Sequence, residues 1–174
     1  MAELEAEIGR LITEYQAKTG KLLTIATVES ATGGRMADRI TNVAGSSDYF
    51  KGSMVAYSNE VKIVLLGVKR KTIEDYGAVS EQTVLEMARG GRKLLDVDIC
   101  VSDSGIAGPS GGSPEKPVGL FYLGLAARDA SLSQKYVFLG NREENKRDAA
   151  EAALDMLKQY LLRRVKAGRG SARL

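Results

Sequence analysis

The chain of 174 residues contains no histidine and a single cysteine. The absence of histidine excludes Ser-His-Asp and Cys-His catalysis, and it removes the commonest zinc ligand. Any acyl-transfer chemistry must therefore take its base from lysine, aspartate, glutamate or tyrosine. Cys100 lies in the apolar run "VDICVS" and has no partner for a disulfide within the chain.

Long apolar segments are missing as well. No run approaches the roughly 20 apolar residues that cross a bilayer. The N-terminus, "MAELEAEIGRLITEY", is acidic and amphipathic, with no basic segment leading into an apolar stretch. It does not resemble a signal peptide, so we expect a cytoplasmic protein without membrane association.

Basic charge is concentrated at the C-terminus. The last 12 residues, "RRVKAGRGSARL", hold five of the 25 basic residues and no acidic residue, which leaves residues 1–162 with 20 basic and 22 acidic residues. A slightly acidic body is not typical of a nucleic-acid-binding domain. We expect one domain over 1–162 and a flexible basic tail over 163–174, for which binding to RNA is the less favoured interpretation.

Helical and strand patterns alternate along most of the chain. Apolar periodicity and turn residues predict helices over 4–19, 33–45, 59–67, 79–95 and 141–164, and strands over 22–28, 52–58, 97–104, 118–128 and 132–140. The last two strands form a hairpin. This order predicts a single three-layer α/β/α domain with a mixed, mostly parallel sheet and a C-terminal antiparallel hairpin.

Polar groups follow three of the predicted strands, where ligands bind in open α/β sheets. In the first segment, "ESATGG", Ser30 stands at the start of a helix, and Gly33 and Gly34 permit a tight turn or the close approach of a ligand. The free amides of the next helix favour an anion, either a phosphate or an oxyanion. From this segment alone, a simple helix cap by Ser30 or Thr32 is the favoured interpretation.

The second segment, "YSNEVK", contains a lysine in the first turn of a helix. The helix dipole disfavours the charge of Lys62, and burial would lower its pKa further, so a neutral lysine could serve as the general base for a serine. A solvated surface lysine is the ordinary alternative. Tyr57 ends the preceding strand, where its hydroxyl could donate to the lysine or to a substrate oxygen.

The third segment, "SGIAGPSGGSPEKPVG", holds five glycines and all three prolines of the chain. A stiffened, glycine-rich loop can form the wall of a nucleotide or phosphate pocket. It is neither a P-loop nor a GxGxxG turn. A long loop with a purely structural role is the alternative interpretation.

These segments together resemble the C-terminal domain of the CinA family of competence/damage-inducible proteins, whose characterised members are nicotinamide mononucleotide deamidases. The matching stretches cover roughly residues 5–162 in family order: "ESATGG", "GSSDYFKGSMVAYSNEVKIVLLGV", "GAVSEQTVLEMARG" and "SGIAGPSGGSPEKPVG". The resemblance implies hydrolysis of nicotinamide mononucleotide to nicotinate mononucleotide and ammonia. It also implies a Ser/Lys pair, with no metal and no organic cofactor.

Site residues follow from this resemblance by position. Ser30 matches the nucleophile and Lys62 the base, while Ser47 and Tyr57 match residues that support the pair or the oxyanion. Arg142 suits the substrate phosphate, although a surface arginine is the alternative and Arg147 stands nearby. Substrate contacts are expected from the turn, the loop and the last helix: Thr32, Gly33, Gly34, Ser104, Gly105 and Arg142.

Three positions depart from the family pattern. Ala31 replaces the cysteine of Glu-Ser-Cys-Thr-Gly-Gly, Ser104 replaces a threonine, and "GNR" stands where "GDR" is common. No catalytic group is lost, but a related pyridine nucleotide remains an alternative substrate. A catalytically silent nucleotide-binding module and a DNA-uptake or damage-response partner are the rival functions.

Two further expectations concern the whole protein. About 20 residues precede the first predicted strand, so the pyrophosphatase activity linked to the N-terminal domain of many CinA proteins is not expected. A homodimer or a higher homo-oligomer is left open by the sequence.

Overall fold

A five-stranded sheet in the order β2-β1-β3-β4-β5 forms the middle layer of the protein. The computed structural model describes residues 3–168. β1 (Ile25–Glu29) pairs in parallel with β2 (Phe50–Val55) on one side and with β3 (Ile99–Gly105) on the other. β4 (Leu120–Ala127) pairs antiparallel with β3, and β5 (Ser131–Val137) pairs antiparallel with β4 to form the predicted hairpin at the edge of the sheet. The predicted α/β fold with a mixed sheet is confirmed.

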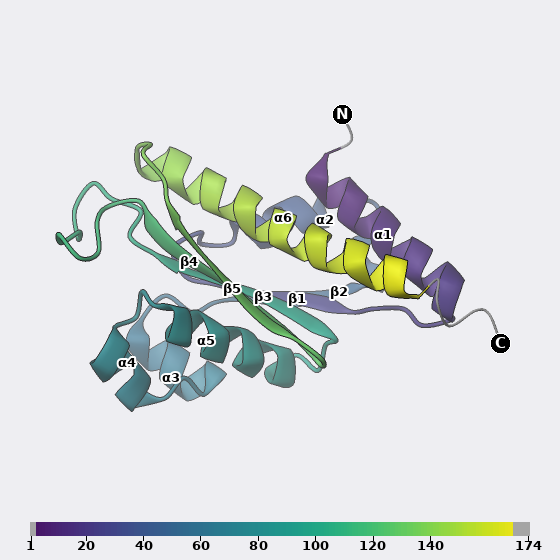
Figure 1. Cartoon of the computed structure of the whole chain (residues 1–174), viewed down its shortest axis with the longest axis horizontal. Helices are drawn as coiled ribbons and strands as arrows, with labels where there is room; N and C mark the ends of the chain where they lie inside the picture. The colour runs from purple at the N-terminus through teal and green to yellow at the C-terminus, as the bar shows by residue number, and fades with distance from the viewer. Residues whose placement is uncertain (1–2, 169–174) are drawn as a thin grey trace.

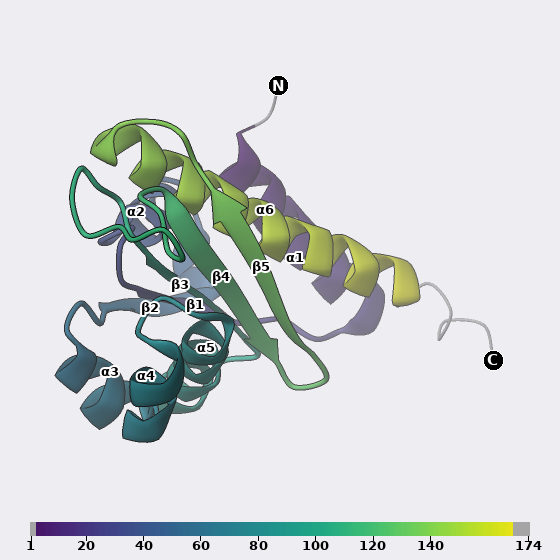
Figure 2. The same cartoon turned by 60° about the vertical axis from the view of Figure 1, so that its left-hand side comes forward.

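Helices cover both faces of this sheet (Figure 1). One face carries α1 (Leu4–Thr19), α2 (Arg35–Thr41) and α6 (Arg142–Ala167). The other carries α3 (Asn59–Leu66), α4 (Arg70–Tyr76) and α5 (Glu81–Leu94), and the turned view in Figure 2 shows the same two layers. The short helix α4 was not predicted. Within residues 3–168, no helix is both long and apolar enough to cross a membrane.

Serine side chains cap the N-termini of α3 and α5. The Ser58 hydroxyl accepts from the amide of Val61 to begin α3, and Ser80 caps α5 in the same way. α2 ends at Thr41, earlier than predicted, and a 3₁₀ turn, η1 (Ser46–Asp48), precedes β2. α6 continues to Ala167, so the first part of the expected flexible tail is helical, while 169–174 lie outside the described residues.

The main core lies between the sheet and the pair α1 and α6, with Ile8, Ile25, Leu123 and Leu157 among its buried residues. A smaller core lies under α5 on the opposite face. Packing explains why a helix with two adjacent glycines persists there. A Cβ atom at Gly90 would lie 1.7 Å from the carbonyl oxygen of Leu66, so the glycine lets α5 approach α3 closely and thereby fixes the position of α3.

Candidate active site

Ser30 and Lys62 meet at the carboxyl ends of two neighbouring parallel strands. Ser30 follows β1 directly, and Lys62 projects from α3, which begins shortly after β2. The Nζ atom of Lys62 lies 3.0 Å from the Oγ atom of Ser30. Both side chains are buried, with exposed fractions of 7% for Ser30 and 1% for Lys62. The fold thus joins two residues that are 32 positions apart in the sequence.

The amine of Lys62 has two further neighbours, and both are backbone carbonyls. Nζ lies 2.8 Å from the oxygen of Ala56 and 2.9 Å from the oxygen of Tyr57. Burial lowers the pKa of Lys62, and the charge of Asp103 opposes part of that fall. A neutral amine has two hydrogens and one lone pair. Two carbonyls can accept the hydrogens, which leaves the lone pair for the hydroxyl proton of Ser30, as a general base requires.

A buried carboxyl group holds the turn that carries Ser30. Asp103 of β3 is completely buried, and its Oδ1 atom accepts the amide of Ser30 at 2.9 Å. Its Oδ2 atom accepts the amide of Thr32 at 3.1 Å. The Thr32 hydroxyl also contacts Asp103. These bonds tie the turn after β1 to the neighbouring strand and fix the direction of the Ser30 side chain.

A second buried carboxyl group occupies the N-terminus of α2. Glu29 accepts the backbone amides of Gly34 at 2.8 Å, Met36 at 3.2 Å and Ala37 at 2.9 Å. The sequence predicts that these free amides bind a phosphate or an oxyanion. The structure corrects that expectation, because the side chain of Glu29 already satisfies the helix terminus.

A pocket of about 280 Å³ opens over the Ser30–Lys62 pair, just below the roughly 300–1,000 Å³ that ligand sites occupy. Its walls include six of the residues predicted from the sequence: Ser30, Tyr57, Lys62, Ser104, Gly105 and Arg142. Thr32, Gly33 and Gly34 do not line it. Thr32 is completely buried, and the two glycines shape the turn with positive φ angles of 65° and 97°.

The rim of the pocket is fixed by contacts between its walls. Nη1 of Arg142 donates to the carbonyl of Gly108 at 2.6 Å, and Nη2 lies 3.4 Å from the hydroxyl of Tyr57. The Ser104 hydroxyl donates to the carbonyl of Ala78 at 2.8 Å. Arg147 pairs instead with the adjacent Asp148. Of the two arginines considered from the sequence, the structure brings Arg142 to the pocket.

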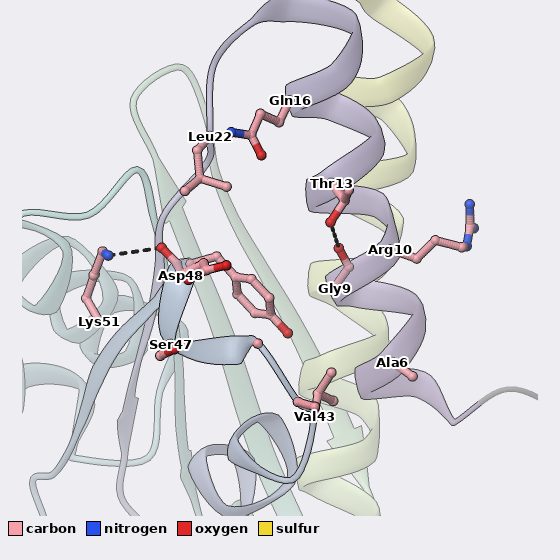
Figure 3. Close-up of a pocket in the computed structure, with 13 residues that line it drawn as sticks. Ala6, Gly9, Arg10, Thr13, Gln16, Leu22, Val43, Ser47, Asp48 and Lys51 are labelled. Atoms are coloured by element: carbon pink, nitrogen blue, oxygen red, sulfur yellow. Dashed lines mark hydrogen bonds between the residues drawn. The ribbon is translucent and has the colours of Figure 1, made fainter.

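Ser47 lies elsewhere in the protein. It belongs to η1, which precedes β2, whereas Lys62 and Tyr57 follow the opposite end of that strand. Figure 3 shows Ser47 in a separate groove between η1 and α1, a space of about 780 Å³. The structure therefore does not bring Ser47 to Ser30.

Sequence reasoning missed the two carboxyl groups behind the site. Glu29 and Asp103 both stand inside apolar strand segments, "TIATVES" and "ICVSDSG", where charged residues are rarely buried without partners. A charged residue inside an apolar strand segment was therefore the signal in the sequence that could have indicated these two carboxyl groups. The wall formed by Ala78 and Val79 before α5 was also missed, since only the fold brings it near the turn after β1.

Comparison with known proteins gives consistent matches over nearly the whole chain. The model of the CinA C-terminal domain family matches residues 3–161. A CinA-like protein of Kosmotoga olearia is 47% identical over 158 residues, which cover 91% of this chain and 38% of the relative. A CinA-like protein of Desulforapulum autotrophicum is 48% identical over 160 residues, 91% of this chain and 36% of the relative. The chain thus spans well under half the length of these relatives.

Solved structures match the fold as well. A competence/damage inducible protein of Agrobacterium tumefaciens superposes with a TM-score of 0.81 and 38% identity, covering 88% of this chain and 93% of its own. A competence-damaged (CinA) superfamily protein of Klebsiella pneumoniae gives a TM-score of 0.84 with 29% identity, covering 92% and 96% of the two chains.

Proposed function

The chain belongs to the CinA C-terminal domain family, and on this premise we propose that it is an amidohydrolase that converts nicotinamide mononucleotide to nicotinate mononucleotide and ammonia. Such a reaction serves the salvage of pyridine nucleotides. One observation carries the proposal: a buried lysine, whose charge is disfavoured, lies 3.0 Å from a serine hydroxyl at the floor of a pocket. A module that only binds nucleotides has no need of a base at a hydroxyl.

In the proposed reaction, neutral Lys62 takes the proton of Ser30 while Oγ attacks the carboxamide carbon. The tetrahedral intermediate then collapses, the carbon–nitrogen bond breaks, and the Lys62 ammonium gives its proton to the departing nitrogen, which leaves as ammonia. Water attacks the resulting ester, with Lys62 again accepting a proton. That proton returns to Oγ of Ser30 when the nicotinate product leaves, and the enzyme is restored.

The oxyanion needs donors other than the amides of α2. The amides of Ser30 and Thr32 are bonded to Asp103. Between them, the amide of Ala31 has no acceptor within residues 3–168. An amide directly after the nucleophile is a common oxyanion donor in serine hydrolases. We assign this donor to Ala31, with the hydroxyl of Tyr57 as its partner across the pocket.

The phosphate of the substrate is assigned to Arg142. Its guanidinium lines the pocket, and one of its amino groups lies 3.4 Å from the hydroxyl of Tyr57. A planar guanidinium binds phosphate through paired hydrogen bonds. The reacting amide and the phosphate would then bind in the same pocket.

Ammonia release from nicotinamide mononucleotide tests this function directly. We expect wild-type protein to release ammonia, and both Ser30→Ala and Lys62→Met to lose roughly 10³-fold or more in kcat/KM. Lys93→Met, at an exposed position of α5, serves as the control and should keep full activity. Full activity in Lys62→Met would refute the mechanism, and binding of the nucleotide without turnover in folded wild type would favour the binding-module alternative.

A further inference from the structure

The hydroxyl of Thr32 lies between two buried carboxyl groups. Its Oγ1 atom is 2.8 Å from Oε2 of Glu29 and also within hydrogen-bonding distance of Oδ1 of Asp103. All three side chains are completely buried. A hydroxyl has one proton, and an ionised carboxylate can only accept. The hydroxyl can therefore donate to one carboxylate, and the second carboxyl group completes the arrangement when it carries a proton and donates to the hydroxyl oxygen.

The hydrogen-bond partners indicate which carboxyl group holds that proton. Glu29 accepts three amides at the N-terminus of α2, and its Oε1 atom also lies 3.2 Å from the hydroxyl of Thr27. These donors and the helix dipole favour a negative charge on Glu29. Asp103 accepts only two amides. Burial raises the pKa of Asp103 to about 6, and the charge of Glu29 adds to this rise.

We propose that Glu29, Thr32 and Asp103 form a unit that holds one titratable proton, and that Asp103 is the positioning residue through which this unit fixes the Ser30 turn and controls the charge of Lys62. The effect of this unit on catalysis rests on the Ser30–Lys62 reaction proposed above. The proton-holding unit itself is a property of three buried side chains and is measurable without a substrate.

Charged groups approach the unit from each neighbouring element. Glu29 comes from β1 and Lys62 from α3, and the charge of Asp103 raises the pKa of Lys62. From α2, Arg35 donates to the carbonyl of Thr32 at 3.4 Å. From α6, the ammonium of Lys146 lies beside Gly33. Among these, Lys62 is the group that changes its charge in the reaction.

The sign of the coupling follows from these charges. Below about pH 6, Asp103 is neutral and burial alone governs Lys62. As the pH rises through about 6, Asp103 ionises, and its negative charge favours the protonated lysine. Lys62 must become an ammonium when Ser30 attacks, so an ionised Asp103 stabilises the charge that forms in that step, as a buried aspartate does for the imidazolium of a serine protease.

The first test observes Asp103 in the wild-type protein. Aspartate labelled with ¹³C at the carboxyl carbon is followed by NMR over a pH series, and Asp103→Asn identifies the signal. We expect a midpoint of about 6, against an ordinary value of about 3.9. A midpoint at the ordinary value would overturn the proposal, and this result does not depend on the enzyme's substrate.

The second test observes Lys62 through ¹³C at its ε carbon, with Lys62→Met identifying the signal. In Asp103→Asn the neighbouring charge is absent at every pH, so we expect the midpoint of Lys62 to fall, because the charge of Asp103 raises the pKa of Lys62. The acid limb of kcat/KM for nicotinamide mononucleotide should move in the same direction. An unmoved lysine midpoint would overturn the proposal. Correct midpoints without ammonia release would refute the proposed function and leave the proton-holding unit in place.

A matched pair at Thr32 tests the hydroxyl. Thr32→Ser keeps it, and Thr32→Val removes it at almost the same volume. We expect Thr32→Ser to resemble wild type. In Thr32→Val we expect the Asp103 midpoint to move, because the hydroxyl is a direct hydrogen-bond partner of this carboxyl group, and kcat to fall roughly 10- to 100-fold with little change in KM. A folded Thr32→Val protein with the wild-type Asp103 midpoint would contradict the proposal.

Discussion

The buried amine of Lys62 should make the stability of the protein depend on pH. Burial lowers the pKa of Lys62 in the folded state, while the unfolded chain keeps the ordinary value of 10.5. Below the folded pKa, both states are protonated and the full cost of the buried charge is present. As the pH rises through the folded pKa, the folded state loses its proton first. The cost shrinks and is gone above about 10.5.

Lys62→Met isolates this contribution, because methionine keeps most of the buried volume and cannot titrate. The free energy of unfolding of wild type, minus that of Lys62→Met, should rise with pH between the folded pKa and 10.5. One titrating group gives a maximum slope of about 1.4 kcal/mol per pH unit. The direction of the pKa shift fixes the sign of the slope. The contacts of the methionine add the same free energy at every pH and do not change that sign.

Urea unfolding followed by circular dichroism over a pH series measures this difference. Contributions from the tyrosines and from Cys100 cancel, because both proteins contain them. Lys93→Met provides the control, since an exposed lysine meets water in the folded and the unfolded chain alike. Its difference curve is the baseline against which the Lys62→Met curve is compared. A flat curve for Lys62→Met would show that Lys62 keeps its proton in the fold, and the general-base reasoning would then fail.

Two other variants test the packing of the site and the end of the pocket. Gly90→Ala should destabilise the protein by about 1–3 kcal/mol and lower kcat, because its Cβ meets the Leu66 carbonyl of the helix that carries Lys62. The control Lys93→Ala should change stability by no more than about 0.5 kcal/mol. A Gly90→Ala protein more stable than wild type would refute this account. Arg142→Ala should raise KM for nicotinamide mononucleotide roughly 10- to 100-fold with kcat largely kept, whereas an equal rise in Arg147→Ala would show that the phosphate was assigned to the wrong arginine.

The pairing of Ser30 with Lys62 could be anticipated because it depends on local order. Each residue follows a strand, and parallel strands bring their carboxyl ends to one edge of a sheet. The same rule explains the outcome for Ser47. It precedes β2, so a parallel pairing of β1 and β2 places it at the other end of the sheet. Matching by motif alone carried no information on which end of a strand a residue occupies.

The hydrogen bonds behind the site could not be read from the sequence. Free amides at a helix start are visible as a pattern, but the side chain that satisfies them is not, and here Glu29 reaches them from the strand before the turn. Asp103 is 73 residues away from Ser30 along the chain. Contacts of that separation depend on the order of strands in the sheet, which periodicity does not determine. Helix α4 was missed for a local reason, since seven residues carry little periodic signal.

The buried charges explain how a catalytic lysine can exist in a protein without histidine. An isolated lysine in an apolar core would be neutral at physiological pH and would be a poor proton carrier. Here two carbonyls and a hydroxyl hold the amine in place, while Asp103 opposes the effect of burial. Asp103 is in turn kept from easy ionisation by burial and by Glu29. The sequence therefore places three charged residues, Lys62, Asp103 and Glu29, in buried positions around one serine. Each of these buried charges is unfavourable alone, and together they place the lysine where it can both accept and return a proton.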